Sequence, residues 1–263
     1  MAGDLSAIYT LWLREIIRFK RARSRVIGGF VGPLMWIAIM GVGLGAAFSG
    51  AFAQATHGET YLMFVAPGVI GMILLFGSIF SAISIIWDRQ FGFMKEILVA
   101  PISRMSIVLG KVIGSATVSL INALILFVIL VIFGVINVWT IGIINFLLAM
   151  VFMALISTAF VSMGLIIVSR MDSFEGFQLI SNFLVTPMFF LSGAFFPINT
   201  APDWMKVLAY IDPLYYGVDG LRGLLTGFKG LGTNIDLVVL IIANVILFIV
   251  ASILFRRIKA SLS

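Results

Sequence analysis

Few side chains in this sequence have the type and spacing that catalysis or metal binding requires. His57 is the only histidine and there is no cysteine, which excludes disulfides, thiolate metal sites and an HExxH zinc site. A lone histidine in a polar loop is more often solvated than a ligand, because a metal site needs several converging donors. Gly110-Lys111 does not complete a P-loop, since Met105 and Val112 stand where glycine and Ser or Thr are needed. We therefore predict no catalytic residue, no metal site and no cofactor held by this chain.

The acidic residues lie mainly at the ends of long apolar runs, as at Asp88, Asp172, Glu175 and Asp236. A proton-coupled or ion-coupled carrier usually needs an ionisable group or a broken-helix ion site near the bilayer midplane. A lipid-modifying enzyme needs a cluster of acid, base or metal ligands. Neither pattern stands out, so a secondary carrier and an intramembrane enzyme are the weaker alternatives. The energy for any transport should come from another protein.

One segment, Asp88–Arg104, concentrates charge between two apolar runs. Neither the hydrocarbon of a bilayer nor a dry protein core accepts such ions cheaply, so we expect the segment to face water or another protein. A short helix is expected over 89–98. It should end before Pro101, because proline disfavours the helical conformation in the residue before it.

Long apolar runs lie on both sides of this segment in the sequence. The chain has 263 residues, of which 62% are hydrophobic and 11% charged, and its mean hydropathy is +1.19, values that exclude an ordinary soluble domain. A helix that crosses a bilayer takes about 20 mainly apolar residues. We expect an all-α membrane protein that forms a single transmembrane domain over residues 1–263. The six expected spans are 26–48, 61–87, 107–136, 143–168, 177–196 and 237–255.

Two further segments are expected at the membrane surfaces. Residues 1–25 are amphipathic, with Arg14, Arg18 and Arg21 on a helical face away from the apolar side chains, as in an interfacial helix. An ordinary positively charged flank would explain the same residues. Residues 197–234 are too apolar for a simple loop, and two stripes predict two short re-entrant helices on the outer side. The stripes are Trp204, Leu208 and Ile211, then Val218, Leu221 and Leu225.

Three amide side chains fall inside expected spans, Gln178, Asn182 and Asn244. Buried amides between membrane helices usually hydrogen-bond to a neighbouring helix, and we favour this interpretation. A place on a transport route is the alternative. It is strongest for Asn182, because Pro187 would loosen the neighbouring turn.

Basic residues are distributed unevenly between the two sides of the expected bundle. Six spans put both termini on one side, and that side carries most of the Lys and Arg, whereas the other side carries only Lys206, Arg222 and Lys229. The positive-inside rule then places both termini and Asp88–Arg104 in the cytoplasm. The net charge of +6 is explained by this topology, so nucleic acid is not an expected partner. The basic residues on the cytoplasmic side are Arg14, Arg18, Lys20, Arg21, Arg23, Arg25, Arg89, Lys95, Arg104, Lys111, Arg170, Arg256, Arg257 and Lys259.

Two segments resemble the membrane subunits of type-2 ATP-binding-cassette (ABC) exporters. The first, Asp88–Gly92 with Val99–Arg104, looks like the cytoplasmic coupling segment of that family. The second, Phe190–Pro197 with Asp212–Arg222, is similar to the family signature at the end of span five and in the outer re-entrant helices. Asp212 departs from the pattern, where asparagine precedes the proline, but a helix-capping role survives that change. The resemblance covers essentially the whole chain.

The resemblance implies a half-transporter in the plasma membrane of a prokaryote. Two copies of the chain would pair with two cytoplasmic ABC ATPase subunits, which bind ATP and Mg, and membrane lipids would surround the assembly. Movement of the ATPase would tilt the spans around a pathway at the dimer interface. The residues that it implies for coupling to the ATPase are Asp88, Arg89, Gly92, Lys95, Glu96, Pro101 and Arg104.

The same resemblance assigns a signature to the outer segment. An equally good interpretation is that the signature residues only hold the re-entrant turn. For the other segment, Asp88–Arg104, the alternative is a plain solvated loop. Asp219 and Arg222 are three residues apart and are expected to pair on one helix face. The signature residues are Ser192, Gly193, Phe196, Pro197, Pro213, Asp219 and Arg222.

The cargo is the least constrained part of this hypothesis. Relatives of this kind handle amphipathic drugs, lipid-linked oligosaccharides and long polysaccharides. The amino-acid sequence of Asp88–Arg104 resembles most closely that of the drug and lipo-oligosaccharide branch of the family. We therefore expect an amphipathic drug-like or lipo-oligosaccharide cargo, with a lipid-linked polysaccharide as the alternative.

Overall fold

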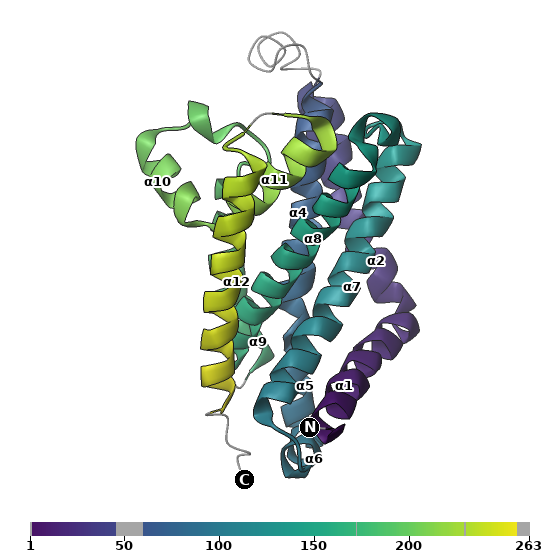
Figure 1. The fold of residues 1–263 in the computed structure, drawn as a ribbon, viewed down its shortest axis with the longest axis vertical. Coiled ribbons are helices and arrows are strands. Elements are labelled where there is room, and N and C mark those ends of the chain that lie inside the picture. The colour runs from purple at the N-terminus through teal and green to yellow at the C-terminus, as the bar shows by residue number, and fades with distance from the viewer. Residues whose placement is uncertain (1, 46–59, 172, 229, 257–263) are drawn as a thin grey trace.

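A computed structural model describes residues 2–45, 60–171, 173–228 and 230–256. The loop around His57, together with Asp172, Lys229, Arg257 and Lys259, lies outside these residues. All regular elements in the described ranges are helices, and they form one elongated bundle (Figure 1). They are α1 (Ala2–Arg21), α2 (Arg23–Trp36), the π-helix η1 (Ile37–Leu44), α4 (Tyr61–Ser81), α5 (Ile83–Gln90), α6 (Phe93–Val99), α7 (Arg104–Ile132), α8 (Val138–Val168), α9 (Phe174–Leu191), the short η2 (Ile198–Thr200), α10 (Asp203–Ile211), α11 (Pro213–Thr226) and α12 (Thr233–Arg256).

Among the described residues, five helical stretches are long and apolar enough to cross a membrane. They confirm the all-α, multi-pass membrane class. The described part of the expected first span, 26–48, is divided between α2 and η1, residues 46–48 lie outside the described residues, and the apolar helix found in the described part is Phe30–Ile39. The count of six spans therefore stays a prediction. The five stretches are Tyr61–Gln90, Arg104–Ile132, Ile141–Val168, Phe174–Leu191 and Thr233–Phe255.

Glycines with a positive φ end or interrupt helices at two predicted boundaries. Gly193 (φ 72°) follows α9, so the fifth span ends at Leu191 and not at the predicted residue 196. Gly142 (φ 72°) breaks the start of α8 where a link over 137–142 was expected. Residues other than glycine rarely adopt this left-handed conformation, which is why both positions interrupt the regular helix.

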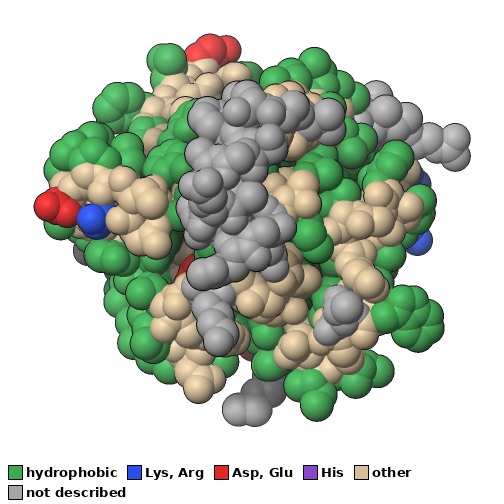
Figure 2. All heavy atoms as spheres, turned by 90° about the horizontal axis from the view of Figure 1, so that it is seen from above, with side chains coloured by type: hydrophobic (Ala, Val, Ile, Leu, Met, Phe, Trp, Pro, Cys, Tyr) green, Lys and Arg blue, Asp and Glu red, His purple; other side chains and the backbone are tan. Residues whose placement is uncertain are grey.

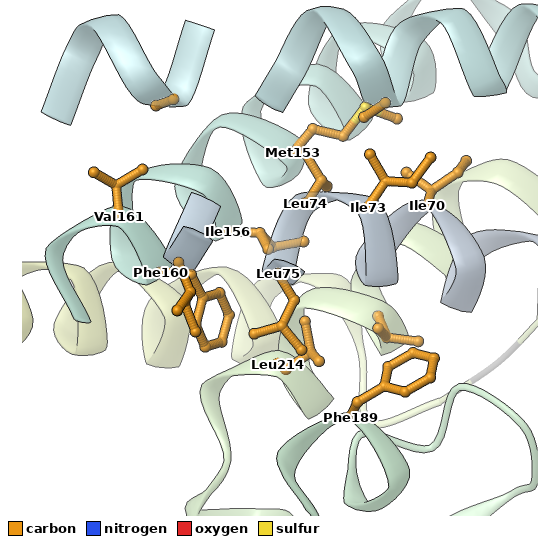
Figure 3. Close-up of a cluster of buried hydrophobic side chains, with 14 of the residues drawn as sticks. Ile70, Ile73, Leu74, Leu75, Met153, Ile156, Phe160, Val161, Phe189 and Leu214 are labelled. Carbon is orange, nitrogen blue, oxygen red and sulfur yellow. The ribbon is translucent and has the colours of Figure 1, made fainter. Parts of the chain in front are cut away.

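The core lies between α4, α8, α9 and α11. Figure 3 shows side chains from these helices meeting, among them Leu74, Ile156, Phe160, Phe189 and Leu214, all of them buried. Helix α4 is the central element, since 67% of its most apolar window is buried, against 17% for α12. The apolar surface left exposed on α12 suits contact with lipid hydrocarbon.

The two ends of the bundle differ in character. Helices α1, α5 and α6 and the last residues of α12 gather at one end, here called the α1 end, and α10 and α11 gather at the other (Figure 1). Figure 2 looks onto the α11 end, where hydrophobic and uncharged atoms dominate the coloured surface and few charged side chains show. The α11 end thus carries few charged side chains (Figure 2), as the uneven distribution of basic residues in the sequence predicted.

The two outer helices bury their apolar stripes differently. The stripe of α11 is buried, with Val218 and Leu221 fully inaccessible, because α11 packs on α4, α8 and α12. Trp204 and Ile211 of α10 are 63% and 73% exposed. Helix α10 is therefore a surface helix with an apolar outer face, and α11 is part of the core.

Candidate functional site: an ionic cluster behind an exposed helix, and an outer clasp

The charged segment is a helix end, a turn and a second short helix. Helix α5 continues α4 as far as Gln90, and Gly92, with φ 76°, turns the chain so that α6 begins at Phe93. The expected single helix over 89–98 is wrong in its first half, because this left-handed glycine separates Arg89 from α6. Helix α6 ends at Val99, and Ala100 is extended (ψ 141°) before Pro101, as predicted.

Asp88 is buried and joins α5 to α1. Arg14 Nη2 donates to Asp88 Oδ2 at 2.6 Å, and Arg18 Nη2 donates to Asp88 Oδ1 at 3.2 Å. Two basic residues predicted for the headgroup layer are thus turned into the protein, whereas Arg21 is exposed. Leaving the carboxylate of such a buried pair without its partner costs about 3–5 kcal/mol.

Glu15 and Lys111 make a second buried pair, between α1 and α7. Lys111 Nζ donates to Glu15 Oε1 at 2.6 Å, and Glu15 Oε1 is also 3.7 Å from Arg14 Nη2. Arg14, Glu15, Arg18, Asp88 and Lys111 are here called the ionic cluster. It binds α1, α5 and α7 to one another.

Glu15 was not singled out in the sequence, but a signal for this contact exists there. Gly110 and Gly114 lie four residues apart on the face of α7 that carries α1. A Cβ on Gly110 would lie 2.9 Å from Leu11 Cβ, and one on Gly114 would lie 3.1 Å from Glu15 Cβ. A small-xxx-small pair beside a lysine in a membrane helix predicts close packing against a helix that carries a carboxylate.

The start of α1 is attached to the start of α7. Asp4 Oδ1 accepts hydrogen bonds from Ser103 N at 2.9 Å and from Ser106 Oγ at 2.8 Å. The bond from the Ser103 amide, followed by those from the two serine hydroxyls, lowers the pKa of Asp4 below its usual value. Helix α1 is therefore held along α7 from Asp4 to the ionic cluster.

The predicted coupling residues separate into internal and exposed ones. Arg89 Nη1 donates to Met171 O at 3.0 Å, which links α5 to the turn between α8 and α9. Arg104 is half-buried at the first position of α7. Lys95, Glu96 and Pro101 are exposed on or next to α6.

The exposed surface of α6 also includes apolar residues that the sequence argument missed. Phe91 is 84% exposed and Val99 is 85% exposed. Bare apolar side chains beside Lys95 and Glu96 are typical of a surface that another protein covers. Their signal in the sequence was their position inside a charged, water-facing segment. Phe91, Lys95, Glu96, Val99 and Pro101 are here called the α6 surface.

The outer signature is a turn that Arg222 holds on α4 through Gly193 and Phe64, an arrangement here called the outer clasp. Arg222 Nη2 donates to Gly193 O at 2.7 Å and its Nε donates to Phe64 O at 3.1 Å. The guanidinium also lies over the Phe64 ring, 3.7 Å from its centroid, a favourable cation–π contact. A Cβ on Gly68 would lie 2.7 Å from Ala194 Cα, so only glycine lets α4 and this turn approach so closely.

The remaining signature residues also make local contacts. Ser192 Oγ donates to Phe189 O at 2.6 Å, and Phe196 and Pro197 are half-buried before η2. Asp212 Oδ1 accepts from Leu214 N at 2.9 Å and caps α11, whose first residue is Pro213. These contacts support the interpretation that the signature holds the turn.

The expected pair between Asp219 and Arg222 is wrong. Asp219 Oδ2 instead accepts from Leu231 N at 2.8 Å, while Arg222 is occupied by the two carbonyl groups of Phe64 and Gly193. The two side chains leave α11 toward different segments, Asp219 to the 230–231 turn and Arg222 to the turn at Gly193. Spacing along one helix did not reveal these competing partners.

The amide residues divide into two kinds. Asn244 Nδ2 donates to Leu155 O at 2.7 Å, and its Oδ1 accepts from Thr158 Oγ1 at 2.7 Å, so it joins α12 to α8 as expected. Gln178 and Asn182 are exposed on α9, so they are not buried between helices of the described chain, and a contact with another chain stays a prediction.

Comparison with known proteins identifies the family. The model of the ABC-2 type transporter family matches residues 6–226, which include most of α1, the charged segment and the outer signature. The chain belongs to the ABC-2 type transporter family. Members of this family are the membrane components of ABC transporters and are not the ATPase.

Named relatives span nearly the full chain. Transport permease ycf38 of Cyanophora paradoxa is 26% identical over 274 residues, which cover 98% of this chain and 90% of the relative. Nodulation protein J of Rhizobium leguminosarum bv. viciae is 26% identical over 259 residues, 97% of this chain and 96% of the relative. Nodulation protein J of Rhizobium meliloti (strain 1021) is 26% identical over 250 residues, which cover 94% of this chain and 92% of the relative. The similarity is thus one of whole chains.

Proposed function

We propose that this chain is the permease subunit of an ATP-driven exporter, in which two copies form the pathway and two ABC ATPase subunits supply the energy. The observation that carries the proposal is the ionic cluster, which joins α1 and α7 to α5, the helix that leads into α6. Arg14 of the cluster also lies 4.8 Å from the centroid of the Phe93 ring at the start of α6. A partner that moves α6 therefore pulls on two long helices through buried contacts. ATP and Mg are bound by the ATPase and not by this chain.

The α6 surface is the proposed docking point for the ATPase. It combines exposed apolar side chains, Phe91 and Val99, with the charged Lys95 and Glu96. Asp88 and Arg89 act behind it, because they are bonded to α1 and to the turn at Met171. The positive-inside rule places the α1 end in the cytoplasm, where ATP is available.

A second copy of the chain is the proposed partner of α9. This helix exposes polar side chains at spacings that put them on one face, Glu175, Gln178, Asn182 and Thr186. Polar side chains that face lipid hydrocarbon are unfavourable, so this face is better placed against protein or an aqueous path. In this proposal α9 faces the dimer interface, and α12 faces lipid.

The proposed cargo is an amphipathic drug-like molecule or a lipo-oligosaccharide, and a lipid-linked polysaccharide is the alternative. The names of the relatives give the class transport permease and the word nodulation but no cargo. We place the assembly in the plasma membrane of a prokaryote, with both termini in the cytoplasm.

Reconstitution with an ABC ATPase subunit, sought first among the neighbouring genes, tests the proposal. Glu96→Lys and Phe91→Ala are expected to weaken assembly and to reduce ATP turnover by the complex, because both side chains lie on the α6 surface. Asp203→Lys and Trp139→Ala are the matched controls. Asp203 lies on α10, and 96% of its side chain is exposed. Trp139 is 94% exposed. Unchanged assembly and turnover in both α6 variants would contradict the proposed docking point.

A further inference from the structure

A cavity of about 460 Å³ lies between α1, α2, α4, α5, α7 and α9, next to the ionic cluster. This volume is within the range of pockets that hold drug-sized molecules. Met72, Phe76 and Phe80 of α4 supply an apolar wall. This half-open cavity therefore offers a recessed apolar surface that water alone would fill poorly.

The opposite wall is polar. Ser115, Ser119 and Asn122 line the cavity from α7 at intervals of four and three residues, so they form one stripe about 10 Å long. Ser115 is 1% exposed. Ser115 Oγ and Asn122 Oδ1 are buried without a hydrogen-bond partner in the described structure. Buried polar atoms are nearly always hydrogen-bonded, so unpartnered atoms in a cavity wall point to a ligand or to water.

One end of the cavity is charged. Glu15 and Arg18 of the ionic cluster both line it. Among the described residues, Arg18 Nη1 has no hydrogen-bond partner, and it lies 3.8 Å from Glu15 Oε1, beyond hydrogen-bond distance. The cluster contains three cations and two carboxylates, which leaves one positive charge at this end. An anion bonded to Arg18 would neutralise that excess.

We propose that this cavity binds an anionic amphiphile within a single copy of the chain. The anionic head lies at Arg18, the apolar tail lies against Met72, Phe76 and Phe80, and hydroxyl or amide groups bond to Ser115 and Asn122. The shared chemistry fits either a transported amphiphile or an anionic membrane lipid. The inference rests on the proposed export function only for the first of these.

Binding is tested with the purified full chain in dodecyl maltoside, using dodecyl phosphate as the anionic probe and its thermal stabilisation of the protein as the readout. Wild type is expected to bind dodecyl phosphate, and Arg18→Gln is expected to bind it about tenfold more weakly, as for one lost charge-assisted hydrogen bond. Arg21→Gln is the matched control, since Arg21 is exposed on the same helix. Ser115→Leu, which fills the cavity with an apolar group, is expected to remain folded and to abolish binding.

The proposal is overturned if dodecyl phosphate does not stabilise the wild type, or if Arg18→Gln and Ser115→Leu bind it as the wild type does. Two arms then separate the sources of the ligand. A rise in ATP turnover when dodecyl phosphate is added to the complex in phosphatidylglycerol nanodiscs supports a cargo site. A resident lipid is supported if phosphatidylglycerol copurifies with wild type but not with Ser115→Leu, and if dodecyl phosphate leaves ATP turnover unchanged. The two proposals can fail separately. If dodecyl phosphate does not bind but Glu96→Lys still lowers ATP turnover, this inference is overturned and the proposed export function stands.

Discussion

Arg222 illustrates how the outer signature acts at the scale of single residues. Arg222 is 4% exposed, and its guanidinium has the carbonyl groups of Phe64 and Gly193 as partners. Burial lowers its pKa to about 10, so it remains protonated at neutral pH. The planar guanidinium reaches two carbonyl groups and a ring face at once, which the single ammonium of lysine does not do.

Asp212 makes a pH dependence measurable at the same end of the molecule. Burial raises its pKa to about 8, although the hydrogen bond from Leu214 N opposes the shift. The folded state then holds a proton that the unfolded chain releases above about pH 4. Stability contributed here is full below pH 4 and falls as the pH rises toward 8.

We therefore expect Asp212→Asn to unfold at a higher temperature than wild type at pH 8.5, and this gap to be clearly smaller at pH 5. Asparagine keeps an oxygen that accepts the Leu214 amide but cannot ionise. Thermal unfolding of the purified chain at the two pH values measures the difference. Asp203→Asn, at an exposed site, should show no such gap, and an equal gap there would contradict the assignment to Asp212.

At the scale of elements, α1 and α7 behave as one unit in the proposed mechanism. Their glycine-mediated contact, the Glu15–Lys111 pair and the bonds from Asp4 hold α1 against α7 over most of its length. Such a unit transmits a displacement of α6 without a change in its own internal packing.

A disulfide between these helices tests that rigidity. The chain has no cysteine, so Leu11→Cys with Gly110→Cys is free of background. An added Cβ on Gly110 would lie 2.9 Å from Leu11 Cβ, closer than the about 3.5–4.5 Å that a disulfide spans, so the two helices separate slightly when the bond forms. We expect ready crosslinking, with ATP turnover by the complex retained.

The control and the contrary outcome for this crosslink are well defined. Tyr9→Cys with Gly110→Cys should not crosslink, because Tyr9 is 59% exposed on α1. Turnover that is lost on oxidation and restored by a reductant would mean that α1 leaves α7 during the cycle.

At the scale of the whole molecule, the two least buried spans differ in chemistry. The exposed face of α12 is aliphatic, as at Ile246, which is 56% exposed. Helix α9 exposes Asn182 beside Phe183, which is 84% exposed. This difference is why we assign lipid to α12 and a second copy to α9.

A single cysteine distinguishes these assignments. Phe183→Cys is expected to yield a crosslinked dimer on oxidation in membranes, because two copies of α9 would face each other. Ile246→Cys is the matched control and should stay monomeric on a denaturing gel. Dimers formed equally from both variants, or from Ile246→Cys alone, would rule out the α9 interface.

Much of this fold was predictable from sequence because its pattern is set by solvent. Apolar runs such as 61–87 must cross a bilayer, charge must leave it, and Pro101 must end a helix. These constraints act locally, so the approximate positions of α4, α7, α8 and α12 followed from the residues, whereas the capping by Asp212 was expected from the family resemblance.

Only the tertiary structure decided which charged groups meet. Asp88 and Arg14 are separated by 74 positions, and whether a basic residue faces headgroups or a buried carboxylate depends on which helices pack together. The same holds for Arg222, whose partners are carbonyl groups that every residue has and that no sequence pattern marks. Local sequence determined where helices begin and end, whereas packing over long separations in sequence determined the ionic cluster, the outer clasp and the cavity.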